Sequence, residues 1–87
     1  MVGKELDHMM QRFPTYRGLI QSLYAGNDDF KAVCDDYWQC SSNIEKIRSE
    51  QAYDNRLLSR YQLLQLELES EALKILTTFK QQPSFNA

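Results

Sequence analysis

The sequence predicts an all-α protein: an antiparallel, coiled-coil-like helical hairpin with an N-terminal helical arm, completed as a bundle by oligomerisation. Apolar residues recur every three or four positions along most of the 87-residue chain, which is the spacing of amphipathic helices. The chain holds only three Gly and two Pro, and several of them fall where one helical stretch gives way to the next. A chain of this length buries only about 60% of its surface alone, so association of copies is a common source of added stability.

The N-terminal arm, residues 1–26, contains two predicted helical stretches. The first covers residues 4–12 and ends before Pro14, because a proline pushes the preceding residue out of helical geometry and itself suits the first turn of a new helix. The second covers residues 15–25. We expect Gly26 to end it in the left-handed conformation that glycine adopts easily.

The predicted hairpin spans residues 27–80. Asn27 is a typical N-cap residue, and the helix after it is expected to run to about residue 50. Its apolar positions step alternately by three and four residues, the heptad spacing with which helices pack against one another. These seam positions are Phe30, Val33, Tyr37, Cys40, Ile44 and Ile47.

The turn of the hairpin is predicted at residues 51–55, where Asp54 and Asn55 can each cap the next helix. Since this segment lacks Gly and Pro, one continuous helix over residues 28–80 is the alternative. The second helix has its own seam, and residues 81–87 are expected to form a disordered tail. The second seam comprises Leu57, Tyr61, Leu64, Leu68, Ala72, Ile75 and Phe79.

Further leucines of the last helix lie off this seam, spread over its opposite side. A helix that faces one partner needs only one apolar stripe, so the pattern predicts a second partner, either the arm or another chain. Aromatic and arginine side chains that are typical of interface hot spots add three more candidates. The candidate interaction residues are Tyr16, Arg17, Trp38, Leu58, Leu66, Leu73 and Leu76.

Two interpretations of Trp38 stay open: the arm covers it, or it is an exposed anchor for a partner. The same two apply to Tyr16 and Arg17. For Arg17 we also expect an ion pair with Asp35 or Asp36, which would tie the arm to the hairpin.

The stretch Phe-Pro-Thr-Tyr-Arg-Gly-Leu-Ile at residues 13–20 resembles the opening of a family of short bacterial helical hairpins typified by YdcH. That family reads approximately Phe-Pro-x-Tyr-Arg-x-Leu-Ile. Residues 35–37 fall where it has an acidic and aromatic stretch, and residues 57–76 resemble its leucine-rich second arm. The resemblance covers about residues 13–76, although this chain lacks the family's lysine-rich segment and the glycines of its loop. It implies a bacterial, cytoplasmic helical hairpin of uncharacterised biochemical role.

The sequence gives little support to catalysis or to a cofactor, metal or small-molecule substrate. The only histidine, His8, is expected to have no nearby Cys, Ser or Asp constellation beyond its neighbour Asp7. With Cys34 and Cys40 it matches no zinc pattern. On a helix these two cysteines lie ~9 Å apart along the axis, which exceeds the reach of a disulfide. We expect both to be reduced and half-buried.

The favoured function is a non-enzymatic helical interaction module, which binds either itself or another helical protein. No apolar run is long enough to span a membrane, and the N-terminus lacks the apolar core of a signal peptide, so we expect a cytoplasmic location. The alternative is a nucleic-acid-associated regulator, disfavoured by a net charge of −2. It would use basic residues near the hairpin tip: Lys46, Arg48, Arg56 and Arg60. A third, weaker hypothesis is a redox sensor with an intermolecular bridge through Cys34 or Cys40.

Overall fold

A computed structural model describes residues 3–50 and 54–80, and these residues form helices and short connections without a strand. The all-α fold class predicted from the sequence is therefore confirmed. The elements in chain order are α1 (Lys4–Arg12), the short 3-10 helix η1 (Pro14–Tyr16), α2 (Arg17–Gly26), α3 (Asp28–Arg48) and α4 (Asn55–Lys80).

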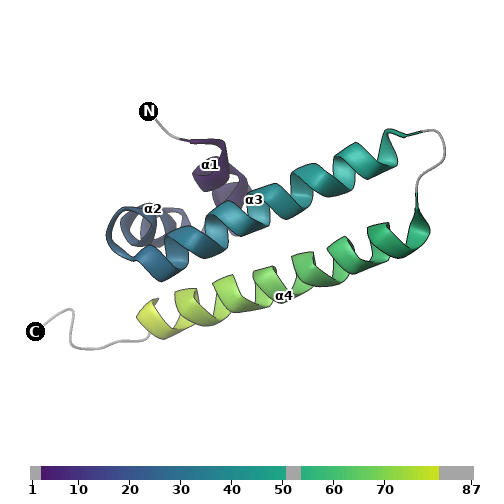
Figure 1. Ribbon diagram of the computed structural model, residues 1–87. Coiled ribbons are helices and arrows are strands. Elements are labelled where there is room, and N and C mark those ends of the chain that lie inside the picture. Colours follow the sequence, from purple (N-terminus) through teal and green to yellow (C-terminus); the bar gives the residue numbers. More distant parts are fainter. Residues whose placement is uncertain (1–2, 51–53, 81–87) are drawn as a thin grey trace, which may run out of the picture.

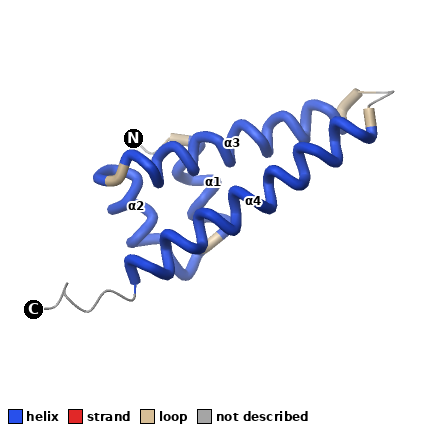
Figure 2. The backbone as a smooth tube through the Cα atoms, turned by 60° about the horizontal axis from the view of Figure 1, so that its bottom comes forward, coloured by secondary structure: helices blue, strands red, loops and turns tan. Residues whose placement is uncertain are grey.

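The helices α3 and α4 run side by side in opposite directions and form the predicted hairpin (Figure 1). The alternative of one continuous helix over residues 28–80 is wrong, because α3 ends at Arg48 and α4 returns along it. The short helix α2 packs near the end of the hairpin that is far from its turn, and α1 crosses the middle of α3 (Figure 2). The molecule is elongated, with extents of 56 × 26 × 21 Å, and its turn end consists of two helices only. The turn residues 51–53 and the predicted tail 81–87 lie outside the described residues.

Local chemistry accounts for the helix ends. Phe13, before Pro14, has φ −126° and ψ 68°, which ends α1. Asn27 is extended, and its side-chain oxygen accepts a hydrogen bond from the backbone N–H of Phe30 at 3.0 Å, so it caps α3. The expectation for Gly26 was wrong: no described residue has a positive φ, and α2 ends because Asn27 turns to extended geometry.

The core consists of two clusters of buried side chains. The larger one joins the arm to the hairpin, and the smaller one holds α3 and α4 together toward the turn. The larger comprises Met9, Met10, Phe13, Ile20, Leu23, Phe30, Cys34, Tyr37, Ala72 and Leu76. The smaller comprises Cys40, Ile44, Ile47 and Leu58. The arm therefore supplies half of the larger cluster and none of the smaller.

The inner face of α4 differs from the predicted seam. Leu57 and Leu64 were expected to face α3, but they are 40% and 41% exposed. Leu58 and Leu76 were expected on the outer side, and both are buried. The observed inner positions mostly step by threes and fours, with Leu58 and Gln65 in place of Leu57 and Leu64 and with Leu76 added next to Ile75. They are Leu58, Tyr61, Gln65, Leu68, Ala72, Ile75, Leu76 and Phe79.

A polar contact explains this shift. The side-chain amide of Gln65 donates a hydrogen bond to the hydroxyl of Ser41 at 3.1 Å, so a glutamine occupies a position where the heptad pattern favours leucine. Leu76 is buried for another reason, since it reaches the arm residues of the larger cluster. On α3 the predicted seam lies inward throughout: Phe30, Tyr37, Cys40, Ile44 and Ile47 are buried, and Val33 is half-buried.

Candidate interaction surface

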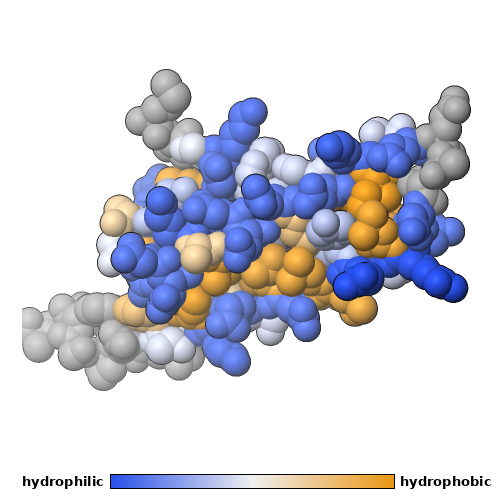
Figure 3. Space-filling view, in the orientation of Figure 1, coloured by the Kyte–Doolittle hydropathy of each residue, from blue (hydrophilic) through white to orange (hydrophobic). Residues whose placement is uncertain are grey.

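Five leucines of α4 remain exposed in the folded chain. Their exposed fractions are 40% for Leu57, 63% for Leu63, 41% for Leu64, 62% for Leu66 and 41% for Leu73. Figure 3 shows apolar side chains gathered in a band along α4 on the viewed face. Large exposed apolar patches on small proteins mark interaction sites, so α4 carries the candidate interaction surface.

One group of these leucines borders a groove. Leu57 and Leu64 are seven residues apart and so lie on the same side of α4. With Arg60 and Tyr61 they line a hollow of about 460 Å³. This groove lies toward the turn of the hairpin, away from the arm. Its walls are apolar side chains with one guanidinium at the edge.

A second group lies elsewhere on the same helix. Leu66 and Leu73 are also seven residues apart, and the α-helical rotation places them roughly 180° around α4 from Leu57 and Leu64. Leu63 projects between the two groups. Four leucines of α4 were predicted to contact a partner. Leu66 and Leu73 are exposed and available for such a contact, whereas Leu58 and Leu76 lie in the core, so the prediction fails for these two.

A polar cluster joins three helices where the arm meets the hairpin. His8 Nε2 on α1 lies 2.9 Å from the Ser41 hydroxyl on α3, which also accepts from Gln65 on α4. The His8 ring is 4.9 Å from the ring of Tyr37 and stands edge-on to Trp38, 5.5 Å away. The expectation that His8 has no nearby serine was therefore wrong. Since 33 residues separate the two, no local motif could have revealed the contact.

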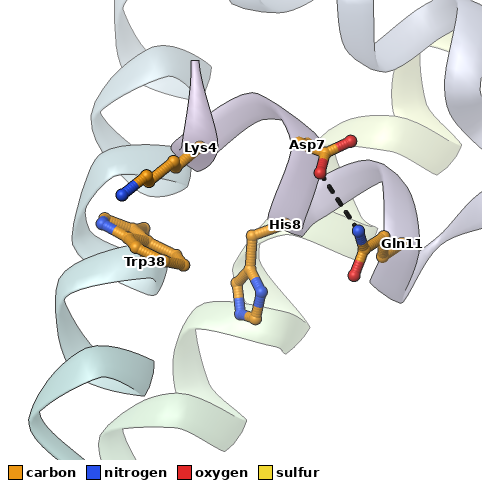
Figure 4. A pocket seen from close by; sticks show the side chains of 5 residues that line it. All are labelled: Lys4, Asp7, His8, Gln11 and Trp38. Atoms are coloured by element: carbon orange, nitrogen blue, oxygen red, sulfur yellow. Dashed lines mark hydrogen bonds between the residues drawn. The ribbon is translucent and has the colours of Figure 1, made fainter. Parts of the chain in front are cut away.

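Two cavities adjoin this cluster. The smaller, of about 140 Å³, is shown in Figure 4 with the His8 ring between Trp38 and Gln11. The larger measures about 420 Å³, and its lining residues are His8, Gln11, Trp38, Ser41, Ile44, Glu45, Arg48 and Gln65. Trp38 is half-buried: α1 covers it in part, and the remainder of its ring borders both cavities.

The Ser41–His8 contact has the distance of a nucleophile and its base, but its surroundings favour a structural role. Ser41 lies inside α3, where backbone N–H groups already donate to carbonyls of the helix and cannot line an oxyanion hole. The nearest acid in sequence, Asp7, instead accepts a hydrogen bond from Gln11 at 3.1 Å (Figure 4). We interpret the cluster as a tie that fixes α1 across α3 and α4.

A second tie is centred on Glu69 of α4. One carboxylate oxygen accepts from Arg12 at 3.1 Å and the other from the Tyr37 hydroxyl at 2.6 Å. Burial raises the pKa of Glu69, but the hydrogen bonds from Arg12 and Tyr37 outweigh this, so that its pKa lies below the usual value. The hydrogen bond to Glu69 raises the pKa of Arg12. The pKa of Tyr37 is also raised, mainly by burial and secondly by its hydrogen bond to Glu69.

The tie predicted for Arg17 does not form. Arg17 is exposed, and Asp35 accepts a hydrogen bond from the hydroxyl of Tyr24 at 3.1 Å. Burial and this bond raise the pKa of Tyr24 to about 12. Tyr16 is half-buried, with the Lys80 ammonium 5.2 Å from the centre of its ring. Tyr16 and Tyr24 therefore contact the hairpin, whereas Arg17 faces solvent.

Both cysteines are free and fully buried, deeper than expected. Burial raises the pKa of Cys34 to about 12 and also raises that of Cys40. The Cys40 thiol donates a hydrogen bond to the backbone carbonyl of Tyr61 at 3.0 Å. Thiols in such surroundings are inert, because the reactive form is the thiolate.

Within 3–50 and 54–80, no three His, Cys, Asp or Glu side chains lie close enough together to bind a metal ion. No helix in this part of the chain combines the length and apolar character needed to cross a bilayer.

The four basic residues near the turn do not form one patch. Arg48 lines the cavity beside Trp38, whereas Arg60 lines the leucine groove of α4. Glu45, Glu50 and Asp54 are interspersed among them along the chain. Phosphate binding favours a continuous basic stripe, which this arrangement does not provide.

Comparison with known proteins adds no assignment. No family model, no curated protein and no solved structure matches the chain.

Proposed function

We propose that this protein is a non-enzymatic interaction module whose helix α4 binds another helix. The observation that carries the proposal is the set of five leucines, 40–63% exposed, between Leu57 and Leu73. Fully burying a leucine side chain is worth about 1.5–3 kcal/mol. One partner helix can cover Leu57, Leu63 and Leu64 but not also the group on the opposite side of α4. Because these three side chains are already partly covered, their burial contributes roughly 2–4 kcal/mol, which offsets part of the loss of freedom on association.

The groove suits a helix as its occupant. An amphipathic helix binds by inserting side chains spaced three, four and seven residues apart into an apolar groove. Leu57, Tyr61 and Leu64 present that same spacing, so ridges of a partner helix can pack between them. Arg60 stands at the rim, where a charge influences orientation more than affinity.

The nucleic-acid alternative has weaker support, because Arg48 and Arg60 border different cavities and acids lie between the two pairs of basic residues along the chain. The proposal also includes the bacterial cytoplasm as the location, as the resemblance to the YdcH family implies.

Photocrosslinking in the native cell tests the proposal. A photoreactive amino acid placed at Leu64 or at Leu66 should form crosslinked species that run well above the mass of the single chain. The same amino acid at Gln39, exposed on the outer side of α3, is the matched control. If crosslinks at Leu64 and Leu66 are no more abundant than those at Gln39, the α4 surface has no helical partner and the proposal fails.

A charged substitution supplies the complementary measurement. Leu64→Asp replaces a 41% exposed side chain, so helix content should remain near that of the parent chain. Crosslinking from a photoreactive amino acid at Leu63, the 63% exposed neighbour of Leu64, should decrease. Circular dichroism of the purified variant separates loss of binding from loss of folding.

A further inference from the structure

Four charged side chains of α4 share one side of the helix. Arg56 and Arg60 lie in its first part, and Glu67 and Glu71 lie near its midpoint. Successive residues of an α-helix are rotated by ~100° around its axis, so these four positions fall within an arc of about 60° around α4. They form one charged stripe beside Leu57 and Leu64, with two arginines followed by two glutamates. Lys74 lies beyond it on the same side of the helix.

This stripe is unfavourable for an isolated chain. Arg56 and Arg60 are four residues apart and repel each other across one helical turn, as do Glu67 and Glu71. Arg56 also lies in the first turn, near the positive end of the helix dipole. In the part of the chain that the structure describes, none of the four has an ion-pair partner, and the ion pair present joins Arg12 to Glu69. Lys74, three residues after Glu71, offsets part of the repulsion at the acidic end, whereas no acid stands three or four residues from Arg60.

The stripe is symmetric about one point. Arg60 and Glu67 are equally distant from the midpoint between Leu63 and Leu64, and so are Arg56 and Glu71. A two-fold axis through that midpoint and perpendicular to α4 would place each arginine opposite a glutamate of a second copy. An isologous interface needs this property, since the same patch must be complementary to itself.

We propose that the helix bound by α4 is α4 of a second copy, antiparallel to the first and centred between Leu63 and Leu64. This inference rests on the proposed function and specifies its partner. The leucines beside the stripe become covered and supply the apolar area. Arg60 of each copy faces Glu67 of the other, and Arg56 faces Glu71. A parallel arrangement in the same register would place arginine against arginine, so the charges select the direction.

Paired charge reversals test the direction and the register together. An acidic variant, R56E with R60E, carries four acids in the stripe, and a basic variant, E67K with E71K, carries four bases. Alone, each variant should dimerise about tenfold more weakly than the parent chain or worse, because like charges then face each other. Mixed in equal amounts, the two should form a heterodimer about as tight as the parent homodimer. Sedimentation velocity at micromolar concentration measures all three states.

The matched control reverses two charges elsewhere at the same end of the hairpin. K46E with R48E changes the net charge as much as the acidic variant does, but on the last turns of α3, and should leave dimerisation within about threefold of the parent. Far-ultraviolet circular dichroism of each variant confirms folding. Should a double variant be unfolded, the single variants R60E and E67K replace it, with the same expected loss alone and recovery on mixing.

The outcomes separate this inference from the proposed function. A parent chain that is monomeric throughout the micromolar range, or variants that do not recover on mixing, would overturn the antiparallel self-pairing. If Leu64 nevertheless crosslinks to a different protein in the cell, the interaction module stands and its partner is not a second copy. If Leu64 crosslinks to nothing, both fall.

Discussion

Glu69 connects α4 both to the arm and to α3. It lies within the hairpin, yet its two oxygens accept from Arg12, the last residue of α1, and from Tyr37 of α3. The bond from Tyr37 is short and partly buried, whereas Arg12 is 47% exposed. Screened ion pairs contribute little and hydrogen bonds to a charged acceptor contribute more, so most of the stabilisation comes from Tyr37.

The lowered pKa of Glu69 sets the direction of a pH effect. Because the folded-state pKa lies below the unfolded value, the carboxylate stabilises the fold above the unfolded pKa, and this contribution is lost as the pH falls through the folded-state pKa. Glu69→Gln should lower the free energy of unfolding by about 1–2 kcal/mol at neutral pH. The difference from the parent chain should shrink below about pH 4. Urea unfolding at both pH values measures it, and a difference that is independent of pH would contradict the role of the charge.

The buried thiols provide a second test at the residue scale. Cys34 and Cys40 are almost inaccessible to solvent, and burial raises the pKa of both. In the folded protein a thiol reagent such as Ellman's should react with neither at an appreciable rate, whereas both should react at once in denaturant. Rapid modification of one thiol in the folded chain would restore the redox-sensor hypothesis, which the burial of both side chains argues against.

At the scale of the helices, the sequence was sufficient to predict where helices begin and end, but not which side of α4 packs against α3. Pro14, Asn27 and Asp54 act on residues within one helical turn, so their effects can be read locally: Asp54, for example, accepts from the backbone N–H of Arg56 at 2.9 Å. The orientation of α4 depends on Gln65 meeting Ser41, 24 residues away. Leucine occurs on nearly every side of α4, so periodicity alone could not choose between neighbouring stripes.

The candidate site was predictable in part for the same reason. An excess of leucine beyond one stripe indicated an unused apolar surface, and Leu66 and Leu73 do remain exposed. Leu57 and Leu64, which line the groove, were instead assigned to the core. The contacts of His8 with Ser41 and of Arg12 with Glu69 join residues 33 and 57 positions apart. No spacing rule along the chain contains that information.

A matched pair of substitutions tests the observed facing of α4. Leu76 is fully buried and Leu73 is 41% exposed, so Leu76→Ala should cost about 2–4 kcal/mol through the cavity that it leaves. Leu73→Ala should cost less than about 1 kcal/mol. Chemical denaturation at low micromolar concentration measures both while limiting any contribution from association. Equal losses would show that α4 does not have the orientation described here.

At the scale of the whole molecule, the arm and the hairpin depend on one core. Without α1 and α2, the hairpin would expose Phe30, Cys34 and Tyr37, which the arm now covers. The smaller cluster near the turn comprises four residues. Small domains have little stability in reserve, and the α3 and α4 residues of the larger cluster would lose half of their buried partners with the arm. We therefore expect the arm and the hairpin to unfold as one unit.

Two spectroscopic probes can test this cooperativity. Fluorescence of Trp38 reports on the contact between α1 and α3, because its ring stands against His8. Far-ultraviolet circular dichroism reports mainly on the long helices α3 and α4. In a single cooperative transition the two curves measured in urea should superimpose. Ile20→Ala, which opens a cavity at a fully buried arm residue, should shift both midpoints equally and lower the free energy of unfolding by about 2–4 kcal/mol. A fluorescence change that precedes the loss of helix would show that the arm undocks first, and that the hairpin is stable without it.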